Sequence, residues 1–119
     1  MIPPLLNIYA EIPSTLPAEL IQTLAEVGNV RIERIISAGQ ATATGSWYDQ
    51  SWDEWVILLS GSAGLLFEGE QQVRQLAPGD HLLIPAGCRH RVEWTDARQK
   101  TVWLAVHVHS PVHGEIAAG

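Results

Sequence analysis

From Val30 onward, short apolar runs alternate with turn residues. Each run has the length of a β-strand, and the first, residues 30–37, is rich in β-branched residues. They cover residues 30–37, 55–60, 63–67, 73–76, 81–84, 90–94 and 101–109. Glycine, proline and aspartate separate most of them, as in Pro78-Gly79-Asp80 and Pro85-Ala86-Gly87. This spacing predicts an all-β sandwich or barrel.

The segment before Val30 has a different spacing. Pro17 suits a first helical turn, and five apolar residues recur as on one face of a helix: Leu16, Leu20, Ile21, Leu24 and Val27. Gly28-Asn29 is a helix stop signal. We therefore expect one short N-terminal helix that covers an end or a face of the barrel.

The length of 119 residues fits one domain with no linker and no internal repeat. We divide it into an N-terminal arm and helix (residues 1–29), a β-barrel (residues 30–109) and a flexible tail (residues 110–119). The tail is predicted from its small residues and its terminal position.

The composition limits the classes of partner. Thirteen acidic and seven basic residues give a formal net charge of −6, which opposes sequence-independent binding of nucleic acid. No apolar run is long enough for a membrane span, and the first residues lack the pattern of a signal peptide. Cys88 is the single cysteine, so no internal disulfide can form. A cytoplasmic location is the prediction.

Two polar residues are expected to face the interior. Side chains alternate along a strand, so His90, Val92 and Trp94 share one face, and the charged residues between them face water. Glu54 begins a run, residues 55–59, that is apolar on both faces and is therefore predicted to be buried on both sides. An inward carboxylate near an inward imidazole is costly unless it is paired or bound to a metal.

These residues lie within a recognisable pattern. Residues 79–90 contain a glycine, then Pro85-Ala86-Gly87, and His90 three residues after that second glycine. This run resembles the second motif of the cupin superfamily, and the spacing from Glu54 to Gly61 resembles part of the first motif. The resemblance implies a cupin-type jelly-roll barrel, that is, a double-stranded β-helix, with Glu54 and His90 as metal ligands. Trp94 replaces the asparagine that the family usually has.

The first motif departs from the family in its ligands. Cupins usually carry His-x-His before the glutamate. An alignment without gaps puts Trp47 and Asp49 at those positions, whereas a shift of one residue puts Tyr48 and Gln50 there. Under the first alignment Asp49 becomes an oxygen ligand.

The last strand offers a replacement imidazole. Trp103, Ala105, His107 and His109 share one face, and parity alone leaves open whether that face looks into the barrel or outward. If it looks inward, His107 completes a set of two carboxylates and two imidazoles. The hypothetical metal ligands are then Asp49, Glu54, His90 and His107. Such a mixed set suits iron, manganese, zinc or nickel.

Four further residues are candidates for contact with a small organic molecule. They are Trp47, Gln50, Trp94 and Trp103. An aromatic wall with a few polar groups is typical of a ligand pocket, but tryptophans also simply fill barrels. Both interpretations stay open from the sequence.

Three functions are compatible with these patterns. The chain is a metal-dependent oxygenase, isomerase or lyase, a non-enzymatic protein that binds a small ligand, or a metal-free cupin that acts as a dimeric binding module. The two-sided apolar strand and the small size predict a homodimer in each case.

Overall fold

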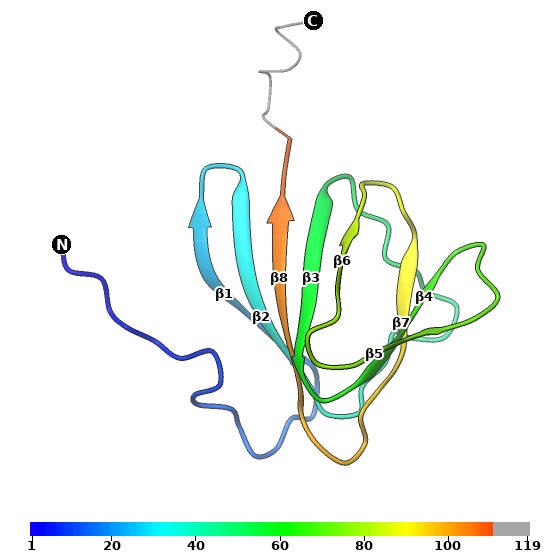
Figure 1. Cartoon of the computed structure of the whole chain (residues 1–119), viewed down its shortest axis with the longest axis horizontal. Coiled ribbons are helices and arrows are strands. Elements are labelled where there is room, and N and C mark those ends of the chain that lie inside the picture. The colour runs from blue at the N-terminus through cyan, green and yellow to red at the C-terminus, as the bar shows by residue number, and fades with distance from the viewer. Residues whose placement is uncertain (111–119) are drawn as a thin grey trace, which may run out of the picture.

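The computed structural model describes residues 1–110, and within that range every regular element is a β-strand (Figure 1). The strands are β1 (Leu20–Val27), β2 (Val30–Ser37), β3 (Asp53–Ser60), β4 (Ala63–Phe67), β5 (Arg74–Leu76), β6 (His81–Ile84), β7 (His90–Thr95) and β8 (Thr101–Val108). Within residues 1–110 there is no helix with the length and apolar character needed to cross a membrane. The predicted tail lies outside the described residues, apart from Ser110.

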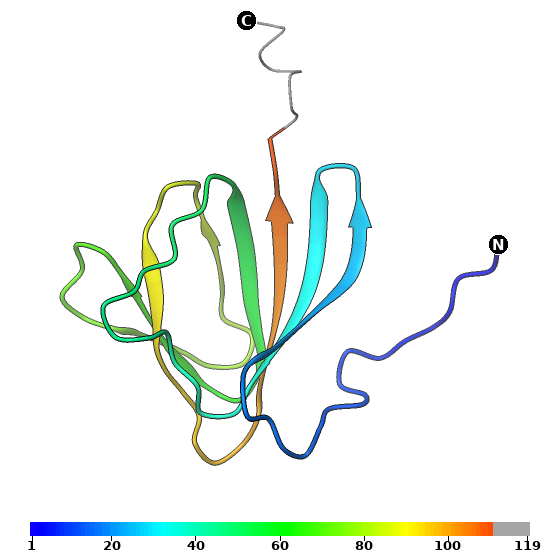
Figure 2. The same cartoon turned by 180° about the vertical axis from the view of Figure 1, so that it is seen from behind.

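The strands form two antiparallel sheets. One has five strands in the order β1-β2-β8-β3-β6, and the other has three in the order β5-β4-β7. Figures 1 and 2 show that the two sheets face each other and diverge at one end, while the first residues run away from the strands. The all-β, jelly-roll prediction is confirmed.

The predicted N-terminal helix is wrong, because residues 20–27 form strand β1. This strand pairs with β2 through a two-residue turn at Gly28-Asn29, where Gly28 has a φ of +58° that suits such a hairpin. A register shift between Thr23 and Ala25 interrupts the alternation of the strand. The apolar residues therefore have helix-like spacing although they belong to two faces of a strand.

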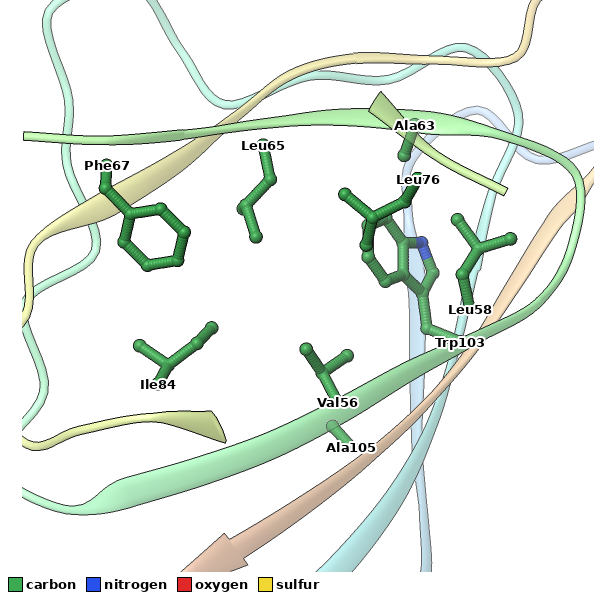
Figure 3. Packing of buried hydrophobic residues seen from close by; sticks show 9 residues of the cluster. All are labelled: Val56, Leu58, Ala63, Leu65, Phe67, Leu76, Ile84, Trp103 and Ala105. Carbon is green, nitrogen blue, oxygen red and sulfur yellow. The ribbon is translucent and has the colours of Figure 1, made fainter. Parts of the chain in front are cut away.

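The core lies between the sheets (Figure 3). Val56 and Leu58 of β3 and Trp103 of β8 face Leu65 and Phe67 of β4, and all five are at most 9% exposed. Because antiparallel neighbours point to the same side of a sheet, the pairs Val56–Ala105 and Leu58–Trp103 place apolar side chains inward together. The face of β8 that carries Trp103 is thus the inner one.

Candidate small-molecule cavity

A cavity of about 130 Å³ lies between the two sheets, next to the core. Its apolar wall consists of Ile21, Ile35, Val56, Leu65, Ile84, Val92 and Trp103. Its polar wall consists of Glu19, Glu33, Tyr48, Gln50, Glu54, His90 and His107. A volume of this size suits a molecule of roughly six heavy atoms.

Glu54 reaches the cavity from the start of β3. It lies opposite His107 on one side and Ile84 on the other, and all three side chains point inward. The residue is 8% exposed, and its Oε1 accepts a hydrogen bond of 2.8 Å from the side-chain amide of Gln50. That bond leaves Oε2 as an acceptor for a bound molecule.

His90 enters the cavity from the start of β7 and is 5% exposed. Its Nδ1 lies 2.9 Å from the carbonyl oxygen of Cys88. Because a carbonyl only accepts, the neutral ring carries its proton on Nδ1, and Nε2 keeps the lone pair. The ring stacks on Tyr48 with a centroid distance of 5.5 Å, which fixes its plane.

Tyr48 covers this part of the cavity. Its backbone pairs with that of His90, and the residue is 44% exposed, so one side of it faces solvent. Burial raises the pKa of the Tyr48 phenol, the Glu19 and Glu54 carboxylates raise the pKa further, and a hydrogen bond with Thr42 lowers it. The phenol therefore stays protonated at neutral pH and can donate a hydrogen bond.

His107 is 5% exposed, lines the cavity and uses both ring nitrogens. The indole Nε1 of Trp52 donates to its Nδ1 over 2.8 Å, and its Nε2 lies 2.9 Å from a carboxylate oxygen of Glu33. An indole only donates, so the proton of the neutral ring is on Nε2 and points to Glu33. The other oxygen of Glu33 lies 2.9 Å from the Nε of Arg31. These four residues form one continuous hydrogen-bonded chain.

The structure corrects the predicted placement of Asp49 and Trp47. The Asp49 side chain is 59% exposed and lies 3.9 Å from Arg89, outside the residues that line the cavity. The ring of Trp47 lies under the guanidinium groups of Arg89 and Arg91, also outside the cavity. Tyr48 and Gln50 line the cavity instead, which agrees with the shifted alignment of the first motif.

Trp94 is also outside the cavity and is 37% exposed. Its register explains this position, because Gly64 pairs with Trp94 whereas the next residue, Leu65, pairs with Val92. The extra residue reverses the alternation, so Val92 faces the cavity and Trp94 lies over Gly64. Among the four candidates for ligand contact, Gln50 and Trp103 do line the cavity.

These positions do not fit the metal site that the family implies. Among the four predicted ligands, Asp49 lies outside the cavity, and His107 has both nitrogens engaged. Glu54 and His90 alone would be too few, because catalytic metal sites usually take about three protein ligands. Within residues 1–110, no group of three or more histidine, cysteine, aspartate and glutamate side chains is arranged to hold a metal ion.

Three polar residues of this region escaped the sequence reasoning. Glu19 and Glu33 line the cavity, and Trp52 holds His107. Glu33 stands in the middle of a strand rich in isoleucine, and a charged residue at such a position signals an inward polar contact. Nothing in the local pattern marks Glu19 or Trp52, because their roles depend on contacts with distant strands.

The family model of the cupin domain matches residues 34–107, which is more than half of the sequence. The chain therefore belongs to the cupin superfamily. None of the curated proteins compared with the chain matches it.

Several solved structures resemble the chain. A protein from Ralstonia eutropha JMP134, provisionally named a mannose-6-phosphate isomerase, is 51% identical, with a TM-score of 0.87, covering 91% of this chain and 100% of that one. A cupin superfamily protein from Desulfitobacterium hafniense DCB-2 is 23% identical, with a TM-score of 0.68 and coverage of 83% and 84%. The polyketide cyclase RemF from Streptomyces resistomycificus is 20% identical, with a TM-score of 0.66 and coverage of 76% and 64%. The last two likenesses concern the fold alone.

Proposed function

We propose that this cupin binds a small organic molecule in its cavity without a metal ion. The ligand carries at least one hydrogen-bond donor and no negative charge. The proposal rests on one observation: two hydrogen-bond acceptors, the Glu54 carboxylate and Nε2 of His90, line the same cavity. A hydrogen bond to Gln50 holds the Glu54 carboxylate, and one to the Cys88 carbonyl holds the His90 ring. Both side chains are therefore already oriented, and binding costs little further side-chain entropy.

The charges around the cavity support the choice of ligand. The lining residues include three glutamates, and the part of the chain that the structure describes contributes no lysine or arginine to that lining. An anion would enter a negative cavity without a cation to pair with, which is costly in a low-dielectric site. A sugar phosphate is therefore an unsuitable ligand.

A proton-transfer reaction on the same ligand is the second candidate. The name of the Ralstonia eutropha structure favours an isomerisation as the reaction to test. The Glu54 carboxylate can accept a proton, and the phenol of Tyr48 can donate one on the same side of the cavity. Incorporation of deuterium from heavy water into a carbon position of the bound molecule would establish this reaction, and its absence would leave binding alone.

A cytoplasmic location goes with this proposal. Cys88 is the single cysteine of the chain and therefore makes no internal disulfide. A fold that needs no disulfide suits a reducing compartment.

The test is a titration of the ¹⁵N-labelled protein with three kinds of probe, followed by NMR. The probes are linear primary alkylamines, small polyols and mannose 6-phosphate. We expect amines or polyols to shift the resonances of cavity residues and mannose 6-phosphate to leave them unchanged. In Glu54→Gln, amine binding should weaken by about 10- to 100-fold, because a hydrogen bond to a charged group is lost.

Asp49→Asn is the matched control, since it removes a neighbouring carboxylate that points to Arg89 rather than into the cavity. It should leave amine binding unchanged. Equal weakening in both variants would show a general effect of charge, and tight binding of mannose 6-phosphate at the cavity would contradict the proposal. Metal analysis of protein prepared with added zinc, manganese, iron and nickel should give background values, whereas one equivalent lost in His90→Ala would restore the metal hypothesis.

A further inference from the structure

The cavity has a deep end and a mouth. At the deep end, Glu54 and His90 are 8% and 5% exposed. Ile21 and Tyr48 line the same cavity but are 55% and 44% exposed. Ile21 belongs to β1, which is the strand at one edge of the five-stranded sheet (Figure 1). Glu19 lies two residues before Ile21, is partly buried and lines the cavity as well. The cavity therefore opens to solvent beside β1, and Glu19 lies at this mouth.

The negative charges of the cavity are only partly balanced. Glu33 lies 2.9 Å from Arg31 through one carboxylate oxygen and 2.9 Å from His107 through the other. Within residues 1–110, Glu19 and Glu54 form no ion pair. A carboxylate that is removed from water is costly unless a cation binds beside it. One such carboxylate lies at each end of the cavity.

Both of these carboxylates are held by neutral donors. The hydroxyl of Ser37 donates to Oε2 of Glu19 over 2.8 Å, and the amide of Gln50 donates to Oε1 of Glu54 over the same distance. Each bond fixes one oxygen and leaves the other, Oε1 of Glu19 and Oε2 of Glu54, as an acceptor. An ammonium group is the stronger partner for such an oxygen, because hydrogen bonds between charged groups are stronger than neutral ones.

His90 supplies an independent sign of a ligand at the deep end. Its Nδ1 is engaged with the carbonyl oxygen of Cys88, whereas its Nε2 has no hydrogen-bond partner in the described part of the chain. A buried acceptor without a donor is rare in folded proteins, so a bound molecule is expected to provide one. A primary ammonium group has three N–H donors and can serve His90 and Glu54 together. A ligand with a single hydroxyl can donate to only one of them.

The two unbalanced carboxylates lie near the same phenol. Burial raises the pKa of Tyr48, and the carboxylates of Glu19 and Glu54 each raise it further. Because the interaction between charged groups weakens with distance, both carboxylates lie close to Tyr48. One linear molecule can therefore reach both of them. The apolar wall of the cavity suits the methylene groups of such a molecule.

We propose that the ligand of this cavity is a linear diamine. Its inner ammonium group donates to Oε2 of Glu54 and to Nε2 of His90, and its outer ammonium group donates to Oε1 of Glu19. The methylene chain between them lies along the apolar wall. This inference rests on the proposed function and narrows its ligand, which has a donor and no negative charge, to one with two positive charges.

The experiment is isothermal titration calorimetry of the full chain with matched pairs of amines. The diamines run from 1,4-diaminobutane to 1,8-diaminooctane, and each is compared with the linear monoamine that has the same number of heavy atoms, n-pentylamine for the first. We expect at least one diamine to bind about tenfold tighter than its monoamine or better. Without a second carboxylate the monoamine would be favoured, because its extra methyl group is easier to remove from water than a charge.

Glu19→Gln tests the carboxylate at the mouth. The glutamine oxygen can still accept the hydrogen bond from Ser37, so the variant is expected to fold. It should lower the affinity for the diamine about tenfold and leave the affinity for the monoamine unchanged. Glu54→Gln should weaken the binding of both amines, because both place an ammonium group at the deep end.

Glu26→Gln is the matched control for Glu19→Gln. It makes the same change of charge at an exposed residue of β1 that lies outside the cavity lining. It should leave the binding of both amines unchanged. A smaller affinity for diamines in Glu26→Gln, equal to that in Glu19→Gln, would show a general attraction of cations and would overturn the role of Glu19.

Two other results separate this inference from the proposed function. Equal affinities of the natural chain for each diamine and its monoamine would overturn the diamine and leave the binding of a smaller donor ligand intact. If neither diamines nor monoamines bind while small polyols do, the ligand is a neutral donor and the diamine is again excluded. If no amine and no polyol binds, the proposed function fails and this inference fails with it.

Discussion

Gly61 and Gly79 both adopt positive φ angles, +86° and +97°, and so form a matched pair for substitution by alanine. They differ in what an added Cβ would meet. At Gly61 it would lie 2.6 Å from the Cα of Thr101 and 2.8 Å from the carbonyl oxygen of Lys100, whereas at Gly79 no heavy atom lies within 4 Å. Alanine at position 61 would therefore have both an unfavourable φ angle and a clash with the neighbouring backbone. Alanine at position 79 would have only the unfavourable φ angle.

The expected magnitudes follow from these two terms. An alanine forced into the left-handed region costs about 1–2 kcal/mol, and this is the whole expected loss of folding free energy for Gly79→Ala. Gly61→Ala adds an overlap with the backbone at the start of β8, where side-chain rotation gives no relief. Overpacking of this kind costs about 1–3 kcal/mol more, so the total loss is about 2–5 kcal/mol.

The assay is urea unfolding of both variants and the natural sequence, followed by circular dichroism and tryptophan fluorescence at one protein concentration. A fixed concentration matters because self-association changes apparent stability. We expect the urea midpoint of Gly61→Ala to lie about 1 M below that of Gly79→Ala. Equal midpoints for the two variants would refute the steric argument and would mean that β3 and β4 can move apart from the start of β8 at little cost.

Two further predictions concern the arm and the cavity. Arg34→Met should lower the free energy of unfolding by about 2–3 kcal/mol, because the carbonyl oxygens of Ile8 and Ala10 and the Gln22 side chain lose their charged donor. It should also speed hydrogen exchange in residues 8–10, and an unchanged urea midpoint would contradict this. Burial and the nearby carboxylates raise the pKa of Tyr48 above its ordinary value of 10.0, so the folded state holds that proton more tightly than the unfolded state. The protonated phenol contributes its full stabilisation below about pH 10, and this contribution is lost as the pH rises through the folded-state pKa. In Tyr48→Phe, the free energy of unfolding should therefore fall less steeply at alkaline pH.

The sequence predicted the strands better than the site. Residues 30–37, 63–67 and 81–84 form strands with the predicted ends, because turn residues mark both ends of each run. The N-terminal segment failed because a bulge in β1 gives its apolar residues a helix-like spacing. A bulge is one extra residue whose position depends on the pairing with the neighbouring strand. The hydrophobic pattern of one segment therefore cannot predict it.

The same cause limited prediction of the site. The second motif placed His90 in the cavity, and Glu54 followed from the first motif and the parity of β3. Whether Asp49 or Gln50 faces the cavity depends on the register of the loop before β3. That register is set by the backbone pairing of Tyr48 with His90, which lies far away in the sequence. The prediction for Trp94 was wrong because of a bulge in β7, three residues after the end of the second motif at His90.

The chemistry of the cavity follows from how His107 is held. To ligate a metal ion, its ring would have to give up its hydrogen bond with either Trp52 or Glu33, both of which are partly buried. Leaving one such buried group unsatisfied costs about 1–3 kcal/mol, and freeing Glu33 would also disturb its ion pair with Arg31. The hydrogen bonds with Trp52 and Glu33 thus occupy both ring nitrogens of His107. The free acceptors that remain, on Glu54 and His90, match a ligand that brings its own donors.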